Sequence, residues 1–299
     1  MVKNGGMVHI DSTTLFQTHK DLLFAIAYRM LGTANDAEDI VQDTFVDVQQ
    51  AGFRRDVKDE KAYLCKIVYN KCKDYMSKTA RARSAYRGPW LPEPMLTEDP
   101  AERVLFQESL ATAYLILLLQ LSETERSIFV LRQVGSFNYA EISYIVEKSE
   151  ANCRQIYRRA KQSIGQIELR SMPDPTRTRL LIEQFVYALQ NGDIAKLMEL
   201  LADDIVFAAD SGGQVPGSLV PVRTAERTAR FLMKTSGFVP TGMITEIEQV
   251  NGQWGLVLSL GADILYVFSF QLHNDRIQAI YATVNPDKLI YIRRQKNRV

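Results

Sequence analysis

The stretch that most constrains the fold is Asn138–Ile167, where two short helical patterns follow each other with almost no connection. Ser149 is a suitable N-cap for the second helix, which has one apolar face and one mainly basic face. Two such helices predict a helix-turn-helix, whose second helix can enter the major groove of DNA. The alternative is an ordinary helical hairpin with a solvated basic face. The first helix is expected to carry an apolar stripe of Tyr139, Ile142, Ile145 and Val146. The buried side of the second is expected to hold Cys153, Ile156, Ala160, Ile164 and Ile167.

Charge is distributed in blocks that the net charge of +1 conceals. Residues 61–90 hold eight basic and one acidic side chain, and residues 126–170 hold eight basic and four acidic ones. Between them, residues 91–125 hold one basic and seven acidic side chains, whereas residues 171–299 hold thirteen of each. Two basic blocks separated by an acidic one predict two separate contacts with a polyanion. The neutral last block predicts a domain with a different task.

Composition is that of a cytoplasmic globular protein. With 299 residues, 46% of them hydrophobic and 24% charged, the chain has room for about two domains. We expect neither a signal peptide nor a contact with a membrane, because no apolar run is long enough. Cys65, Cys72 and Cys153 lie in apolar helical stripes, which predicts buried, reduced thiols. No histidine accompanies them, so a zinc site is not expected, and neither is any cofactor.

Helical periodicity predicts a first helix from Leu15 to Leu31, ended by Gly32. A second helix follows, capped by Asn35 or Asp36. Its acidic outer face continues beyond the first turn, which is farther than the helix dipole alone explains. The sequence therefore predicts either a solvated acidic face or a basic protein partner.

A third helix is predicted from Lys61 to about Lys78. Its exposed side chains are basic, with Tyr63 and Tyr69 between them, a pattern that suits single-stranded or melted nucleic acid. A basic solvated face without a nucleic-acid partner is the alternative. The expected buried stripe is Leu64, Ile67, Val68, Cys72 and Tyr75.

The pattern changes after Thr176. Periodicity predicts helices over 178–190, 194–201 and 224–235, with Asp193 as a cap, and then strands over 243–250, 253–259, 264–272 and 277–284. Asn251-Gly252 is a strong signal for a tight hairpin, and the turn over 273–275 is expected to be longer. Helices followed by an antiparallel sheet indicate an α+β domain that can hold a pocket.

Several segments resemble the sigma-70 family of RNA polymerase sigma factors, in its extracytoplasmic-function (ECF) branch. Residues 36–46 (DAEDIVQDTFV) and 61–76 (KAYLCKIVYNKCKDYM) are similar to region 2, and the helix-turn-helix is similar to region 4. Residues 88–94 (GPWLPEP) resemble the linker signature of the ECF group with a C-terminal SnoaL-like extension. NPDKL at 285–289 resembles that group's second signature.

The resemblance implies a multidomain architecture. An all-α region 2 domain is expected at residues 9–80, a linker at 81–108, an all-α region 4 domain at 109–171, and an α+β SnoaL-like (NTF2-like) cone at 176–299. Such a factor binds core RNA polymerase and directs initiation at specific promoters, with its extension acting in cis. The alternative function is a ligand-sensing helix-turn-helix regulator that never associates with polymerase.

The resemblance also implies contacts with polymerase and promoter DNA. The acidic helix would dock on the clamp helices of the β′ subunit through Asp36, Asp39, Gln42 and Asp43. The third helix and the preceding loop (53–58) would bind the minus-ten element through Lys61, Lys66, Asn70 and Lys73. The helix opened by Ser149 would bind the minus-thirty-five element through Ser149, Glu150, Asn152, Arg154, Gln155, Arg158, Arg159 and Lys161.

Regulation would involve the linker and the extension. Three positions depart from the family pattern. Glu147 stands where the turn of the helix-turn-helix usually has Gly, Tyr63 where a Trp is frequent, and Gln214 where an Asp-Gly-Gly-Gly-Lys stretch ends in Lys. The regulatory residues expected are Trp90, Leu91, Pro92, Glu93, Pro94, Asp210, Gly212, Gly213, Asn285, Pro286, Asp287 and Lys288.

Some SnoaL-like relatives are enzymes, so a catalytic pocket is the remaining alternative for the last block. Asp210, Asp263 and His273 are its obvious acid–base candidates, and His273 is expected to be exposed at a hairpin tip. A sigma factor makes and breaks no bonds, so we expect no catalytic constellation. A small-molecule ligand in the extension stays an open alternative.

Overall fold

The computed structural model describes residues 12–51, 59–97, 111–164, 174–215 and 218–297. Contacts divide the chain into two compact units, one formed by residues 1–83 and 117–167, the other by residues 84–116 and 168–299. The expected linker and the C-terminal domain thus share a unit, although the helix-turn-helix separates them in sequence. Among the described residues, no helix is both long and apolar enough to cross a bilayer.

The first unit opens with α1 (Ser12–Leu31) and α2 (Ala34–Ala51), which pack along each other. Gly32 adopts φ +74°, so the expected end of the first helix is confirmed. The cap prediction for the second helix was wrong, because α2 begins at Ala34 and both Asn35 and Asp36 lie inside its first turn. Its acidic outer face and apolar inner face are as expected.

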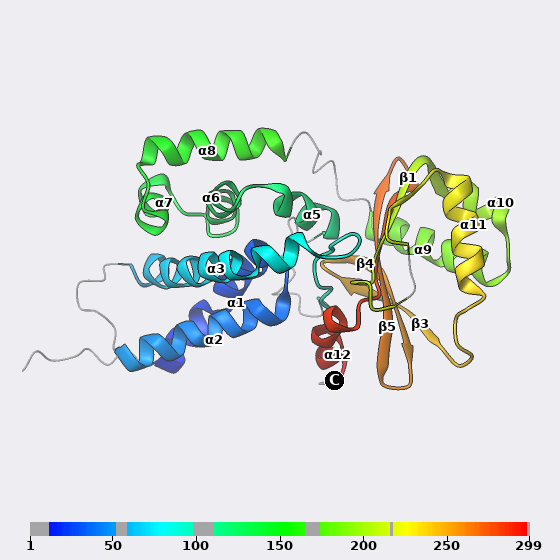
Figure 1. Cartoon of the computed structure of the whole chain (residues 1–299), viewed down its shortest axis with the longest axis horizontal. Coiled ribbons are helices and arrows are strands. Elements are labelled where there is room, and N and C mark those ends of the chain that lie inside the picture. Colours follow the sequence, from blue (N-terminus) through cyan, green and yellow to red (C-terminus); the bar gives the residue numbers. More distant parts are fainter. Residues whose placement is uncertain (1–11, 52–58, 98–110, 165–173, 216–217, 298–299) are drawn as a thin grey trace, which may run out of the picture. The chain divides into compact units, whose positions relative to one another are not determined.

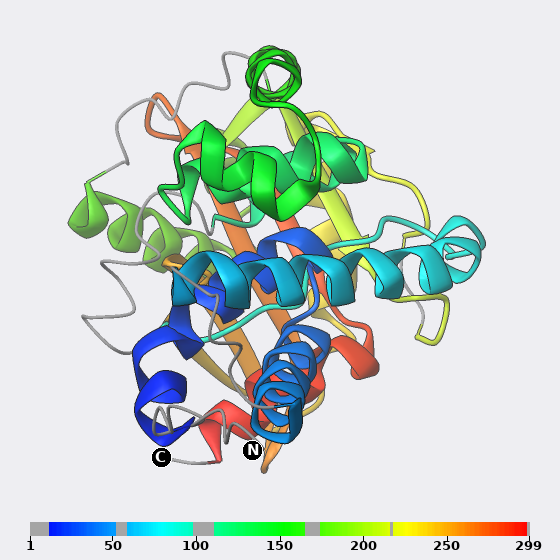
Figure 2. The same ribbon diagram turned by 90° about the vertical axis from the view of Figure 1, so that its left-hand side faces the viewer.

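The third helix, α3 (Glu60–Ser84), runs farther than expected, and Figure 2 shows other helices on two sides of it. Ile67 and Tyr75 were expected in its core but are only half-buried, whereas Cys65 and Tyr69 are buried. Tyr69 is 7% exposed, so its expected role as an exposed stacking aromatic is not supported by the fold. The cause is a second packing partner, since α3 also contacts the helices that form the helix-turn-helix.

That partner consists of α6 (Glu123–Gln133), α7 (Tyr139–Val146) and α8 (Glu150–Ser163). Asn138 and Glu141 form a capping box at the start of α7, and the Ser149 hydroxyl accepts the backbone N–H of Asn152 at the start of α8. The helix-turn-helix prediction is confirmed, with Ser149 as the N-cap. Ile167 lies outside the described residues.

The second unit is built on a six-stranded sheet in the order β2-β1-β6-β5-β4-β3 (Figure 1). β1 and β6 pair in parallel and every other pair is antiparallel. The strands are β1 (Leu201–Asp210), β2 (Val222–Arg223), β3 (Ile244–Val250), β4 (Gln253–Leu260), β5 (Asp263–His273) and β6 (Arg276–Thr283).

The two faces of this sheet are covered by different elements. Three helices, α9 (Pro175–Gln190), α10 (Ile194–Leu200) and α11 (Ala225–Ser236), form the larger core with one face. The short helix η1 (Pro286–Leu289), α12 (Ile290–Lys296) and Leu96 of the linker cover the other face. A short helix α5 (Thr112–Gln120) follows the linker in sequence.

The expected helices and strands of the α+β domain are confirmed to within three residues, and Asp193 caps α10 as predicted. Asn251 and Gly252 form the expected tight hairpin with φ of +50° and +73°. The turn after β5 was expected to be longer, but His273 pairs with Arg276, so it too has two residues. β1, β2, η1 and α12 were not predicted.

Candidate functional site

The outer face of α2 presents the expected acidic surface. Asp39, Gln42 and Asp43 are exposed at helical spacing, and Val46, which continues that row, is 47% exposed. An apolar side chain ringed by carboxylates and an amide suits a protein contact. Asp36 differs from the others because it is half-buried.

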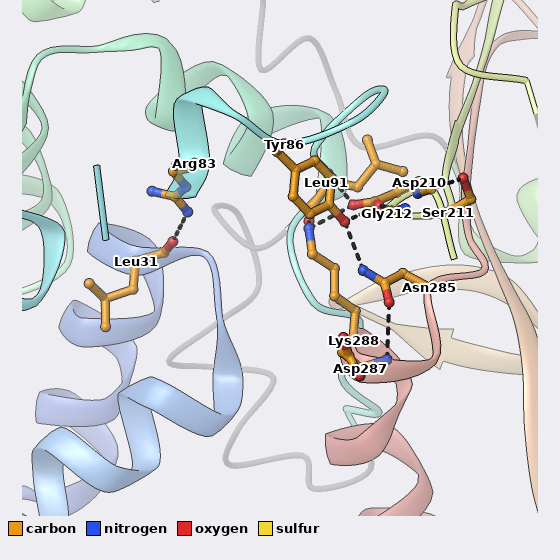
Figure 3. Close-up of polar contacts among 11 residues, drawn as sticks. Leu31, Arg83, Tyr86, Leu91, Asp210, Ser211, Gly212, Asn285, Asp287 and Lys288 are labelled. Carbon is orange, nitrogen blue, oxygen red and sulfur yellow. Dashed lines mark hydrogen bonds and ion pairs between the residues drawn. The ribbon is translucent and has the colours of Figure 1, made fainter. Parts of the chain in front are cut away.

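Asp36 acts within the chain as well. Burial lowers the pKa of the Arg83 guanidinium, while the charges of Tyr75 and Asp36 raise it. Arg83 donates a hydrogen bond to the carbonyl of Leu31 at 2.5 Å, which ties the end of α3 to the end of α1 (Figure 3). The half-buried carboxylate therefore favours the charged form of Arg83 at this joint of the first unit.

The four expected minus-ten residues of α3 fall into two classes. Asn70 and Lys73 are exposed. Lys61 and Lys66 are half-buried, because each is engaged by the helix-turn-helix. The loop over 53–58 lies outside the described residues.

Lys61 donates to the carbonyl of Gly135 at 2.7 Å and lies 4.5 Å from the centre of the Phe137 ring. Lys66 pairs with the carboxylate of Glu147 at 2.8 Å and lies 4.5 Å from the ring of Tyr144. Two cations of the expected DNA-binding helix are thus occupied by groups of α7 and the turns that flank it.

The outer face of α8 is a polar surface exposed along the helix. Cys153, Ile156 and Ala160 are buried against the rest of the unit, so the other side chains point away from it. Arg154 pairs with Glu150 at 2.8 Å and lies 5.2 Å from the Tyr139 ring. All eight expected minus-thirty-five residues are exposed, namely Ser149, Glu150, Asn152, Arg154, Gln155, Arg158, Arg159 and Lys161.

In the second unit the two signature segments meet at one buried carboxylate. Asp210, at the end of β1, is 0% exposed. It accepts hydrogen bonds from the Tyr86 hydroxyl at 2.5 Å, the backbone N–H of Leu91 at 2.8 Å and the Lys288 ammonium at 2.6 Å (Figure 3). The backbone N–H of Gly212 adds a fourth at 3.2 Å. We call these residues the Asp210 cluster.

Lys288 joins the linker to the carboxyl-terminal signature. Its ammonium also donates to the carbonyl of Leu91 at 2.5 Å and lies 3.6 Å above the Trp90 ring. A buried ammonium next to a carboxylate, a carbonyl and an aromatic face has its charge well compensated. Both Trp90 and Leu91 are thereby fixed to the extension.

Asn285 closes the Asp210 cluster from the other side. Its side-chain amide donates to the Tyr86 hydroxyl at 2.8 Å, and its backbone N–H donates to the Asp210 carbonyl at 2.9 Å. Burial and the hydrogen bond to Asp210 raise the pKa of Tyr86, so its phenol keeps the proton that it donates. Gly212 adopts φ +58°, and a Cβ there would lie 2.6 Å from Asn285 Nδ2, so no larger residue fits.

The linker beyond Leu91 continues as part of the sheet unit. Leu96 forms an isolated antiparallel bridge with Val250, and its N–H and carbonyl are both bonded by the side-chain amide of Gln295, at 2.8 and 3.0 Å. The Asn251 side chain accepts the N–H of Met95 at 3.0 Å. Pro92, Glu93 and Pro94 are buried as well.

Most of the expected regulatory residues therefore lie at or beside the contact between the linker and the α+β domain. The structure adds several residues to this contact. Gln214, in place of the family's Lys, donates to Asp287 at 2.5 Å. Gly213 adopts φ +71°, and a Cβ there would lie 3.1 Å from Arg87. Tyr86, Asn251 and Gln295 were missed, and only the position of Tyr86 beside the GPWLPEP stretch hinted at its role.

The three acid–base candidates of the extension do not converge. Asp263 and His273 are exposed at opposite ends of β5, which places them about 33 Å apart at the usual rise per residue. Asp210 is engaged with Lys288, and Asp263 pairs with Arg293 at 3.2 Å. The expectation that His273 is exposed is confirmed.

Comparisons with known proteins agree with this geometry. The chain matches the family models of sigma-70 region 2 over residues 15–82 and of sigma-70 region 4 over residues 113–164. It is 28% identical to the ECF RNA polymerase sigma factor SigJ of Mycobacterium tuberculosis, with 91% of each chain covered. It is 25% identical to the probable ECF sigma factor SigI of the same organism, over 94% of this chain and 96% of SigI.

The crystal structure of SigJ covers nearly the same span. It superimposes with a TM-score of 0.72 at 25% identity, over 93% of this chain and 98% of SigJ. The similarity thus includes the helical regions, the linker and the α+β domain, in the same order. The chain is an RNA polymerase sigma factor of the ECF branch of the sigma-70 family, with a C-terminal α+β domain.

Proposed function

We propose that α2 docks on the clamp helices of the polymerase β′ subunit, that α3 binds the minus-ten element, and that α8 binds the minus-thirty-five element. The observation that carries the proposal is the polar face of α8, which is exposed along its whole length in front of a buried apolar face. The residues nearest its N-terminus, such as Asn152, are placed for base edges, and Arg158 and Arg159 for phosphates. Asp39, Gln42 and Asp43 form the centre of the polymerase contact.

Substitution of Arg158 by alanine tests the assignment of α8. Loss of one phosphate contact should weaken promoter binding by the holoenzyme at every sequence and flatten the salt dependence by about one unit. Footprinting titrations over a range of salt concentrations give that slope. Arg227→Ala, which removes an exposed arginine from the second unit, is the matched control. An unchanged slope for Arg158→Ala would remove this residue from the interface.

We further propose that the extension regulates the factor in cis through the linker. The linker joins the two DNA-binding regions in sequence, and the Asp210 cluster fixes it to the extension. Any signal that alters the extension therefore acts on the segment that connects region 2 to region 4. The separated positions of Asp263 and His273 support a regulatory rather than a catalytic role, in a protein that works beside polymerase in the cytoplasm.

A further inference from the structure

Glu147, in the turn of the helix-turn-helix, adopts a backbone conformation that a side chain disfavours. Its φ of 55° and ψ of 45° lie in the left-handed region, where glycine is the usual residue. A glutamate there needs a compensating contact or a function. The structure supplies one contact, with a helix that is distant in sequence.

That contact is the ion pair with Lys66. The carboxylate of Glu147 is 72% exposed, whereas Lys66 is only 23% exposed and lies between this carboxylate and the Tyr144 ring. The hydrogen bond from Lys66, followed by the charge of Lys66, lowers the pKa of Glu147. The pair is therefore ionised at neutral pH. Of its two members, the ammonium of Lys66 is the one that the contact covers, and the carboxylate of Glu147 stays exposed.

Lys66 is one of the lysines that the proposed function assigns to the minus-ten strand. A phosphate oxygen and a carboxylate oxygen satisfy an ammonium in the same way, so they compete for it. Lys61 is engaged through the Gly135 carbonyl on the same side, whereas Lys73 of the same helix is exposed. Lys61 and Lys66 are the lysines of α3 that contact α7 and its flanking turns. Their contacts therefore depend on the packing of the helix-turn-helix on α3.

The packing that brings Glu147 to Lys66 contains a weak point. Arg126 of α6 is 5% exposed at the contact with α3, and only its Nη2 has a close partner, the sulfur of Met76 at 3.2 Å. Its Nε and Nη1 meet no acceptor among the described residues. A buried cation with so little compensation costs free energy in the packed arrangement.

We propose that Glu147 is an internal latch: its carboxylate occupies Lys66 while the helix-turn-helix packs on α3, and it must leave before Lys66 binds the phosphate of a promoter strand. The proposal rests on the proposed role of Lys66. It gives the carboxylate at this left-handed position a task that glycine cannot perform.

The test compares the wild-type full chain with Glu147→Gly and Glu147→Gln. Glycine suits the left-handed turn, so Glu147→Gly keeps the fold and deletes the carboxylate; glutamine keeps the length and deletes the charge. Asp74→Asn is the control, because it removes one exposed negative charge from α3 itself. Each chain is acylated briefly with an amine-reactive acetyl ester at neutral pH, and mass spectrometry gives the modified fraction of Lys66 relative to Lys73.

We expect the modified fraction of Lys66 to rise several-fold in both Glu147 variants, and to stay at the wild-type value in Asp74→Asn. Equal modification in the wild type and in Glu147→Gly overturns the latch. Fluorescence anisotropy with single-stranded oligodeoxythymidylate then measures phosphate binding by the same chains. If Lys66 is released but affinity for the strand is unchanged, the assignment of Lys66 to the minus-ten strand fails, whereas the masking by Glu147 stands.

Discussion

Two buried cations of this protein have opposite surroundings. Lys288 lies among a carboxylate, a carbonyl and an aromatic ring. Arg126 has one sulfur contact, and burial, followed by the charge of Arg83, lowers its pKa to about 10. Charge compensation rather than burial therefore distinguishes a stabilising cation from a destabilising one.

Arg126→Met should raise the stability of the first unit. Methionine keeps the unbranched stem and removes a charge whose Nε and Nη1 have no acceptor among the described residues, which is worth about 1 kcal/mol. Both tryptophans, Trp90 and Trp254, belong to the second unit, so urea unfolding of the first unit is best followed by its helical circular dichroism. A loss of stability of similar size would show that Arg126 supports the packing.

At the scale of elements, the linker is folded as part of the sheet unit. Leu96 lies in the core under β3 to β5, and the Asp210 cluster fixes the preceding turn. A segment that would be read as a flexible connection from its prolines is instead held at two points, one polar and one apolar. Release of the linker therefore requires both the Asp210 cluster and the core contact of Leu96 to break.

Lys288→Met should destabilise the second unit by about 3–5 kcal/mol, because it leaves Asp210 buried without its cation. Trp90, which lies against Lys288, reports the transition by fluorescence in a urea titration. The matched control is Arg276→Ala, which breaks an exposed pair with Asp203 and should cost about 1 kcal/mol or less. Equal effects of the two substitutions would contradict a structural role for the cluster.

The elements that the sequence predicts well are those whose signals are local. The cap at Ser149, the end of α1 at Gly32 and the hairpin at Asn251-Gly252 each depend on a few adjacent residues. β1 was missed because it follows α10 directly and its apolar run over 205–209 does not alternate, as expected for a strand with a parallel neighbour.

Contacts between distant segments were predicted only where a signature marked them. The NPDKL and GPWLPEP stretches indicated that Lys288 and Leu91 matter, but their meeting at Asp210 depends on the fold. The burial of Tyr69 and the ion pair of Lys66 depend on a packing partner about 80 residues away in sequence. Hydrophobic periodicity is a local signal and cannot predict such a contact.

At the scale of the whole molecule, the charge blocks match elements with different proposed tasks. The two basic blocks contain α3 and α8, which carry the proposed promoter contacts, and the acidic block contains the linker. The electrically neutral block forms the α+β domain that holds the linker. We infer that promoter reading lies in the helical unit and its control in the second unit.

Run-off transcription with core polymerase tests this claim most directly, using the full chain and a chain without residues 173–299. We expect both chains to start transcripts at the same position, because region 2 and region 4 are retained, but to yield different amounts from equal amounts of holoenzyme. Circular dichroism of the shortened chain confirms that its helices are folded. Equal amounts from the two chains would contradict control in cis, and no transcript from the full chain would contradict promoter-directed initiation itself.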